Sequence, residues 1–135
     1  LNLIPILNDS IKNKKIFKVF GNDYKTKDGT CERDFIHVID LAKAHIAALK
    51  KINKIKKYES INLGLGRGIS VINLIHLYEQ INNLKVKYKF TKRRKGDVAI
   101  SVANNKKALE LLDWKPQLSY ENMVHDSWQS YIKNL

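Results

Sequence analysis

Apolar residues in this 135-residue chain recur at helical spacing over long segments and at strand spacing only over short ones. A period of three to four residues indicates an amphipathic helix, whereas alternation indicates a strand with one buried face. The pattern predicts helices over residues 3–13, 41–52, 71–81, 105–113 and 120–131. It predicts strands over residues 16–20, 35–38, 60–63, 85–90 and 98–103. A complete doubly wound parallel sheet needs longer, continuously apolar strands, so we expect a small mixed α/β lobe that packs against something else.

Residues that start and stop helices support these assignments. Asp40, Ser70, Asn104 and Ser119 each precede a predicted helix and carry an oxygen that can accept from its free N–H groups. Pro5 is tolerated because it falls in the first turn of its helix, where no backbone donor is needed. We therefore expect these four polar residues to be N-caps.

Size and composition describe a single soluble domain. The chain is 44% apolar and 28% charged, which is typical of globular proteins, and no apolar run reaches the roughly 20 residues of a membrane span. Its only cysteine, Cys31, excludes an internal disulfide and fits a reducing, cytoplasmic location. The chain begins with Leu1, and its only methionine is Met123, so we expect the C-terminal part of a longer protein.

The net charge of +12 has two interpretations. It can reflect an anionic ligand, such as nucleic acid or a diphosphate, or a general bias toward Lys, Asn and Ile. Most lysines are scattered, and aromatic residues do not interleave with them as a nucleic-acid stacking surface requires. Nucleic-acid binding is therefore the less favoured interpretation. Two basic clusters stand apart, at residues 50–57 and 92–95.

The chain lacks the usual residues of nucleotide-dependent redox chemistry. Residues 64–68 read Gly-Leu-Gly-Arg-Gly, without the Gly-x-Gly-x-x-Gly spacing of a dinucleotide loop. This run either binds a phosphate at the start of the next helix or forms a structural turn, which we favour. No predicted helix carries a Tyr-x-x-x-Lys pair, and no pair of histidines has metal-ligand spacing. Arg33 and Arg94, in separate loops, carry the planar guanidinium that suits a diphosphate, so we expect binding and no catalytic, cofactor-binding or metal-binding residue.

Several short motifs follow one another along nearly the whole chain. They are Asn2-Leu3-Ile4-Pro5, Phe20-Gly21, Arg33-Asp34-Phe35-Ile36-His37-Val38, Asn62-Leu63-Gly64-Leu65-Gly66 with Ser70-Val71, and Arg93-Arg94-Lys95-Gly96-Asp97. Together they resemble the C-terminal, substrate-binding part of UDP-glucose 4-epimerases, in the extended short-chain dehydrogenase/reductase superfamily. The Gly-Asn-Asp-Tyr-x-Thr-x-Asp-Gly-Thr loop at residues 21–30 is similar to the epimerases and is usually lacking in related dehydratases and decarboxylases.

The resemblance implies a role for particular residues. In the epimerases, the residues that match Arg33 and Arg94 hold the diphosphate, and those that match Phe20 and Asp97 contact the base and the ribose. The complete set of expected substrate-binding residues is Asn2, Leu3, Phe20, Arg33, Val71, Arg94, Asp97 and Ser101. Ser101 stands where many bacterial epimerases carry a tyrosine. A small side chain there leaves volume for an acetamido group, so we expect the intact enzyme also to accept N-acetylated sugars.

The resemblance also implies an activity for the intact protein. Residues 1–135 are expected to be the C-terminal lobe of an extended short-chain dehydrogenase/reductase, without the Rossmann core. The intact enzyme would interconvert UDP-glucose and UDP-galactose with NAD, which the absent N-terminal domain binds, and would form a homodimer. By itself this chain should be inactive. The alternatives are another nucleotide-sugar enzyme such as a dehydratase, a basic nucleic-acid-binding module, and a structural fragment without a ligand.

Overall fold

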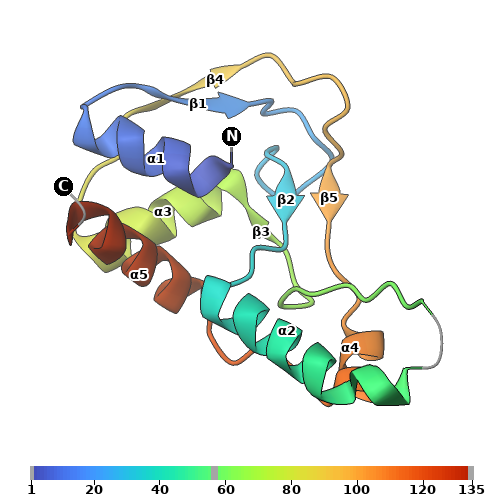
Figure 1. Ribbon diagram of the computed structural model, residues 1–135. Helices are drawn as coiled ribbons and strands as arrows, with labels where there is room; N and C mark the ends of the chain where they lie inside the picture. Colours follow the sequence, from blue (N-terminus) through green and yellow to red (C-terminus); the bar gives the residue numbers. More distant parts are fainter. Residues whose placement is uncertain (1, 56–57, 134–135) are drawn as a thin grey trace.

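The computed structural model describes residues 2–55 and 58–133 as a small mixed α/β fold (Figure 1), which confirms the predicted fold class. The helices are α1 (Leu3–Lys12), α2 (Val38–Lys51), α3 (Val71–Asn82), α4 (Lys106–Leu112) and α5 (Tyr120–Lys133), with a 3-10 turn, η1 (Ile52–Lys54), after α2. The strands are β1 (Phe17–Phe20), β2 (Glu32–Arg33), β3 (Ile69–Ser70), β4 (Tyr88–Thr91) and β5 (Ile100–Ser101). None of the described helices is long and apolar enough to cross a membrane.

The strands form two small sheets. β1 and β4 pair in parallel, with Phe17 opposite Tyr88. The other sheet has the order β3-β2-β5, in which β2 is antiparallel to β3 and parallel to β5. Arg33 thereby lies in a central strand, opposite Ile69 on one side and Ser101 on the other.

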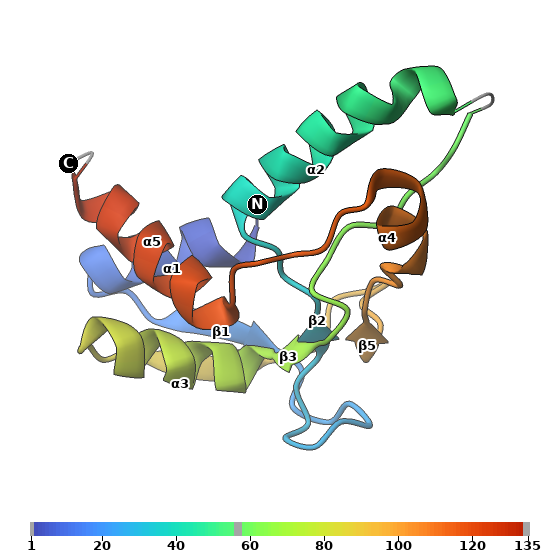
Figure 2. The same ribbon diagram turned by 90° about the horizontal axis from the view of Figure 1, so that it is seen from below.

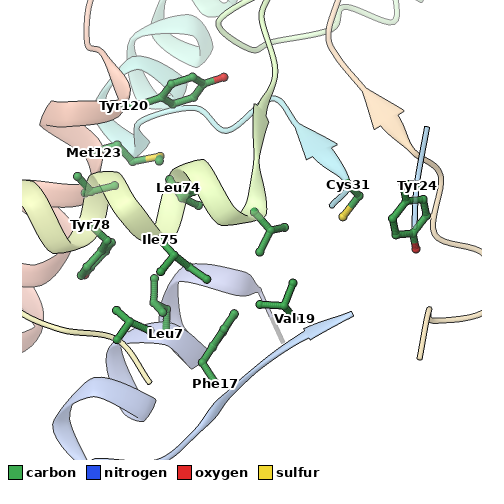
Figure 3. Packing of buried hydrophobic residues seen from close by; sticks show 13 residues of the cluster. Leu7, Phe17, Val19, Tyr24, Cys31, Leu74, Ile75, Tyr78, Tyr120 and Met123 are labelled. Atoms are coloured by element: carbon green, nitrogen blue, oxygen red, sulfur yellow. The ribbon is translucent and has the colours of Figure 1, made fainter. Parts of the chain in front are cut away.

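The main core lies between three helices and the β1–β4 sheet. Figure 3 shows Ile75 of α3 lying toward Leu7 of α1 and Phe17 of β1, and Leu74 lying toward Met123 of α5; Leu7, Leu74 and Ile75 are fully buried. α5 packs along α3 and completes this layer. A separate, smaller cluster joins α2 to α4, and Figure 2 shows these two helices set apart from α1, α3 and α5. The main core therefore carries β1 and the start of α3, which both border the candidate site.

The strand predicted at residues 35–38 is wrong. Pairing in this region is confined to β2, and α2 already begins at Val38. His37 forms the N-cap, because its Nδ1 accepts a hydrogen bond from the backbone N–H of Ile39 at 3.1 Å. The predicted cap, Asp40, lies inside the first turn of α2. Its carboxylate is buried and accepts from the backbone N–H groups of a distant segment, residues 117–118, at 2.9 and 2.7 Å.

The strand predicted at residues 60–63 is also wrong, because these described residues form no strand. The strand that pairs with β2 is instead β3, which follows the glycine run at residues 64–68. The caps are otherwise close to expectation. Ser70 accepts from the N–H of Asn73, and Ser119 from that of Asn122. The N-cap of α4 is Asn105. The predicted cap, Asn104, precedes it and accepts a hydrogen bond from the backbone N–H of Lys106 at 3.0 Å. Residues 56 and 57 of the first basic cluster lie outside the described residues.

Candidate functional site

A cavity of about 430 Å³ lies along α1 and β1, beside the start of α3 and the loop that joins β4 to β5. Its volume falls within the roughly 300–1,000 Å³ that is typical of small-molecule sites. The cavity brings together six of the eight predicted substrate-binding residues: Leu3, Phe20, Arg33, Val71, Arg94 and Asp97. They come from five separate segments of the chain, so only folding makes them neighbours.

Arg33 is held in a fixed orientation at this cavity. Its Nη1 donates to the carbonyl oxygens of Glu32 and Val98, both at 2.8 Å. Its Nη2 lies 3.7 Å from Oδ1 of Asp97. A guanidinium carries five N–H donors, so donors remain for an anion after these contacts. Because two carbonyl groups already fix its plane, Arg33 is preorganised for a bidentate contact with a phosphate.

Arg94 and Asp97 are the two ends of one tight turn. The backbone N–H of Asp97 donates to the carbonyl oxygen of Arg94 at 3.3 Å, and Gly96 has a φ of +87°. A positive φ at the third residue is what a type II turn requires, and glycine adopts it without steric cost. The turn brings a cation and an anion together at the cavity wall, which explains the spacing of the Arg-Lys-Gly-Asp motif.

The side chain of Arg94 lies against an aromatic ring. Its guanidinium carbon is 3.7 Å from the ring centroid of Phe20, which ends β1. Such cation–π contacts form because the face of an aromatic ring is electron-rich. The same ring face could support any planar, delocalised group, including a nucleoside base. An aromatic ring and two arginines therefore border one cavity.

The glycine run at residues 64–68 is a structural turn. Two of its N–H donors, at Leu65 and Gly66, already donate to the carboxylate of Asp34, at 2.7 and 2.9 Å. The same carboxylate accepts from the N–H of Ala103 at 3.2 Å. A Cβ on Gly64 would lie 2.4 Å from Oδ2 of Asp34, so this close approach requires glycine. Asp34 thus ties the turn and the end of β5 to the strand that carries Arg33.

The N-terminus of α3 is occupied by the protein itself. The first N–H groups of the helix, at Val71, Ile72 and Asn73, donate to Cys31 O, Thr30 Oγ1 and Ser70 Oγ. These contacts use the donors that a bound phosphate would need, so the phosphate interpretation of this helix end is not supported. Over residues 2–55 and 58–133, no group of three or more His, Cys, Asp or Glu side chains could hold a metal ion.

Two predicted residues lie outside the cavity. Asn2 is the N-cap residue of α1 and lines an adjoining groove, which Leu3 also borders. Ser101 is exposed in β5 and borders a separate shallow depression with Asp34. Its backbone nevertheless pairs directly with Arg33. The expected role of Ser101 in accepting N-acetylated sugars stays a prediction.

Other residues at the cavity were not anticipated. Lys18 lines it from β1, where the two-residue period of a strand places it on the same face as Phe20. Alternation within Phe17–Phe20 was the signal that could have identified it. Cys31 also lines the cavity. Burial raises the pKa of its thiol, although the charge of Arg33 opposes this shift, so the thiol stays protonated at neutral pH and is a poor nucleophile.

Known proteins match this chain along almost its full length. A family model described as GDP-mannose 4,6 dehydratase matches residues 2–127. A UDP-glucose 4-epimerase from Dictyostelium discoideum is 44% identical over 130 residues, which are 95% of this chain and 38% of the relative. The predicted resemblance to UDP-glucose 4-epimerases is thereby confirmed.

Solved structures agree with this relationship. A UDP-glucose 4-epimerase from Stenotrophomonas maltophila, with bound NAD and formylated UDP-arabinopyranose, superimposes with a TM-score of 0.93 at 36% identity. One from Bifidobacterium longum, in complex with NAD+ and UDP, gives 0.89 at 39% identity. Each match covers 98% of this chain and 40% of the other. The chain therefore spans about two fifths of the length of these relatives.

Proposed function

The chain belongs to the family described as GDP-mannose 4,6 dehydratase, and from this premise we propose that its cavity binds the UDP part of a UDP-sugar. The observation that carries the proposal is the convergence of Arg33 and Arg94, from separate segments, on one cavity that Phe20 also borders. Two guanidinium groups match the charge and geometry of a diphosphate, and an aromatic ring matches a base. In this arrangement Asp97 accepts from the ribose hydroxyls, while Leu3, Val71 and Asn2 contact the remainder of the nucleotide sugar.

Binding would move Arg94 from the ring to the phosphates. In the free chain its guanidinium covers Phe20, and such a contact is worth about 0.5–1 kcal/mol at an exposed site. Stacking of a base on an aromatic ring is worth about 1–3 kcal/mol, and a hydrogen bond to a charged group about 1.5–3 kcal/mol. Base stacking and the hydrogen bond to phosphate each exceed the cation–π contact that is lost. The base of UDP therefore displaces the guanidinium from the ring, and the guanidinium then binds the phosphates.

For the whole protein we propose UDP-glucose 4-epimerase activity, with residues 1–135 as the UDP-sugar-binding region. The two solved epimerases contain NAD, which supplies hydride transfer. The described residues here do not fit a dinucleotide, since the glycine turn at residues 64–68 directs donors at Asp34. We assign no step to NAD within this region. We propose three partners for this region: a UDP-sugar, an NAD-binding domain in another part of the intact protein, and a second copy of the protein.

Titration of the chain with UDP by isothermal calorimetry tests the proposal. We expect saturable binding, with UDP about 10- to 100-fold tighter than UMP, because the second phosphate adds charge-assisted hydrogen bonds worth about 1.5–3 kcal/mol. UMP and uridine serve as matched ligands that lack one or both phosphates. A folded chain that fails to bind UDP, or that binds RNA with no competition from UDP, would contradict the proposal.

A dehydratase is the second candidate, because the matching family model carries that description. The two activities differ in their products. An epimerase returns an isomer of equal mass, whereas a dehydratase releases water. Mass spectrometry of the products that the full-length protein forms from UDP-galactose therefore separates them, and a product lighter by one water would favour the dehydratase.

Replacing Gly96 tests whether the turn at residues 94–97 sets the affinity. A Cβ on Gly96 meets no atom within 4 Å, so Gly96→Ala acts through the backbone conformation alone. An alanine with positive φ costs about 1–2 kcal/mol, and we expect UDP affinity to fall about fivefold or more. Gly96→Asn is the matched control, because asparagine tolerates this conformation, and it should remain within about twofold. Equal affinity of the alanine variant and the wild type would show that the turn is not required.

A further inference from the structure

Arg93, the neighbour of Arg94, does not line the cavity and instead binds the loop at residues 21–31. Its Nε donates to Oδ1 of Asp23 at 2.6 Å, and its Nη2 donates to the backbone carbonyl oxygen of Asp23. Its guanidinium carbon lies 4.1 Å from the ring centroid of Tyr24. The hydrogen bond from Arg93 also lowers the pKa of Asp23. One side chain thus makes an ion pair, a backbone contact and a cation–π contact.

The loop that Arg93 binds is itself held at several points. Tyr24 is buried, with 6% of its surface exposed. The backbone N–H of Gly21 donates to the carbonyl oxygen of Thr91 at 2.8 Å, which joins the start of the loop to β4. At its far end, Asp28 accepts from the hydroxyl of Ser70, the N-cap of α3. Arg93 therefore binds an anchored surface, and the anchor extends to the core.

Gly21 shows how closely these groups pack. It has a φ of +83°, and a Cβ there would lie 2.5 Å from Tyr24 and 2.8 Å from the side chain of Arg93. Cβ atoms do not approach other atoms so closely. The contact between Arg93 and Tyr24 therefore depends on a glycine at this position. The Gly-Asn-Asp-Tyr sequence also supplies the groups that Arg93 contacts, which are the carboxylate and carbonyl oxygen of Asp23 and the ring of Tyr24.

We propose that Arg93 is a positioning residue, which holds the backbone of the loop after β4 so that Arg94 faces the cavity. The two arginines are adjacent, but Arg93 contacts Asp23 and Tyr24, whereas Arg94 contacts Phe20 and lines the cavity. Fixing one side chain of the pair limits where the other can reach. This inference rests on the proposed binding of UDP, and it assigns the first arginine of the Arg-Arg-x-Gly-Asp motif a role that involves no contact with the ligand.

The test compares two variants, Arg93→Lys and Lys92→Met. Lys92 is an exposed neighbour of Arg93, and its replacement by methionine is the control that removes a positive charge from the same segment. Lysine keeps the charge but lacks the planar fork that binds Asp23 at two points. We expect Arg93→Lys to lower UDP affinity about tenfold, which corresponds to about 1.4 kcal/mol, and to leave uridine affinity unchanged, since uridine has no phosphate. Lys92→Met should leave both affinities within about twofold.

A double-mutant cycle separates positioning from general damage. If Arg93 acts through Arg94, Arg93→Lys has no further effect on UDP affinity in an Arg94→Ala chain, because coupled residues are not additive. Additive losses, or an unchanged UDP affinity in a folded Arg93→Lys chain, would overturn the inference while UDP binding itself stands.

A wild-type chain that does not bind UDP would refute the proposed function, and the positioning claim is then judged by NMR. The Phe20 ring shifts the resonances of the Arg94 side-chain protons stacked on it, and we expect Arg93→Lys to abolish this shift. Retention of the shift in Arg93→Lys would overturn the positioning claim.

Discussion

Replacing Arg33 by alanine weakens UDP binding by about 10- to 100-fold, measured by isothermal calorimetry. The expected loss follows from about 1.5–3 kcal/mol for a hydrogen bond to a charged group, at 1.4 kcal/mol for each factor of ten. Arg33 is suited to this effect because Glu32 O and Val98 O already orient its guanidinium. A preorganised side chain loses little entropy when the ligand binds, so most of the interaction energy contributes to affinity.

Two further variants make this result specific. Arg67→Ala removes the same charge from an exposed arginine that lies over Tyr120 and outside the cavity, so it controls for the general positive field of the protein. Arg33→Lys keeps the charge without the planar fork and should give an intermediate loss. If Arg67→Ala lowered the affinity as much as Arg33→Ala, non-specific attraction would explain binding and the assignment of Arg33 would be wrong.

Leu74→Ala lowers the free energy of unfolding by about 2–5 kcal/mol, measured by urea denaturation. Leu74 is fully buried in α3, in the same core cluster as Leu7 and Met123, and Figure 3 shows it on the side of the helix that faces Met123. Truncation removes buried apolar surface and leaves a cavity that the neighbouring helices fill only in part. Domains are stable by about 5–15 kcal/mol in total, so this single change removes a large share of the stability.

Leu109→Ala is the matched control for this prediction. The substitution is chemically identical, but Leu109 lies on α4 with 52% of its surface exposed. Surface substitutions usually stay within about 0.5 kcal/mol, so the two variants should differ severalfold. A loss below about 1 kcal/mol for Leu74→Ala would mean that α1, α3 and α5 do not pack as a shared core in solution.

The expected binding residues are recognisable in the amino-acid sequence because motifs preserve chemistry at short range. Arg94, Gly96 and Asp97 belong to one turn, and its glycine is recognisable from the spacing alone. The motif resemblance to UDP-glucose 4-epimerases is confirmed by a relative that is 44% identical. What the motifs could not supply was proximity, since Phe20, Arg33 and Arg94 are far apart along the chain and meet only through the β2 sheet and the β1–β4 pair.

Local rules failed where distant segments satisfied polar groups. Asp40 has the side chain of an N-cap, but residues 117–118 donate to it from another part of the chain, and His37 caps the helix. The glycine run had two open interpretations, and the carboxylate of Asp34 selects the structural turn. Buried polar groups must find partners, and neither partner can be read from neighbouring residues.

The amino-acid sequence was sufficient to establish the helices, the mixed α/β class and the likeness to a known enzyme family, because periodicity and short motifs depend on residues close together in the chain. It was the folded chain that showed which of the predicted residues share a cavity, and that Arg93 faces away from it. Side-chain direction depends on strand pairing and on long-range hydrogen bonds, as the contacts of Arg33 with Val98 and of Arg93 with Asp23 show.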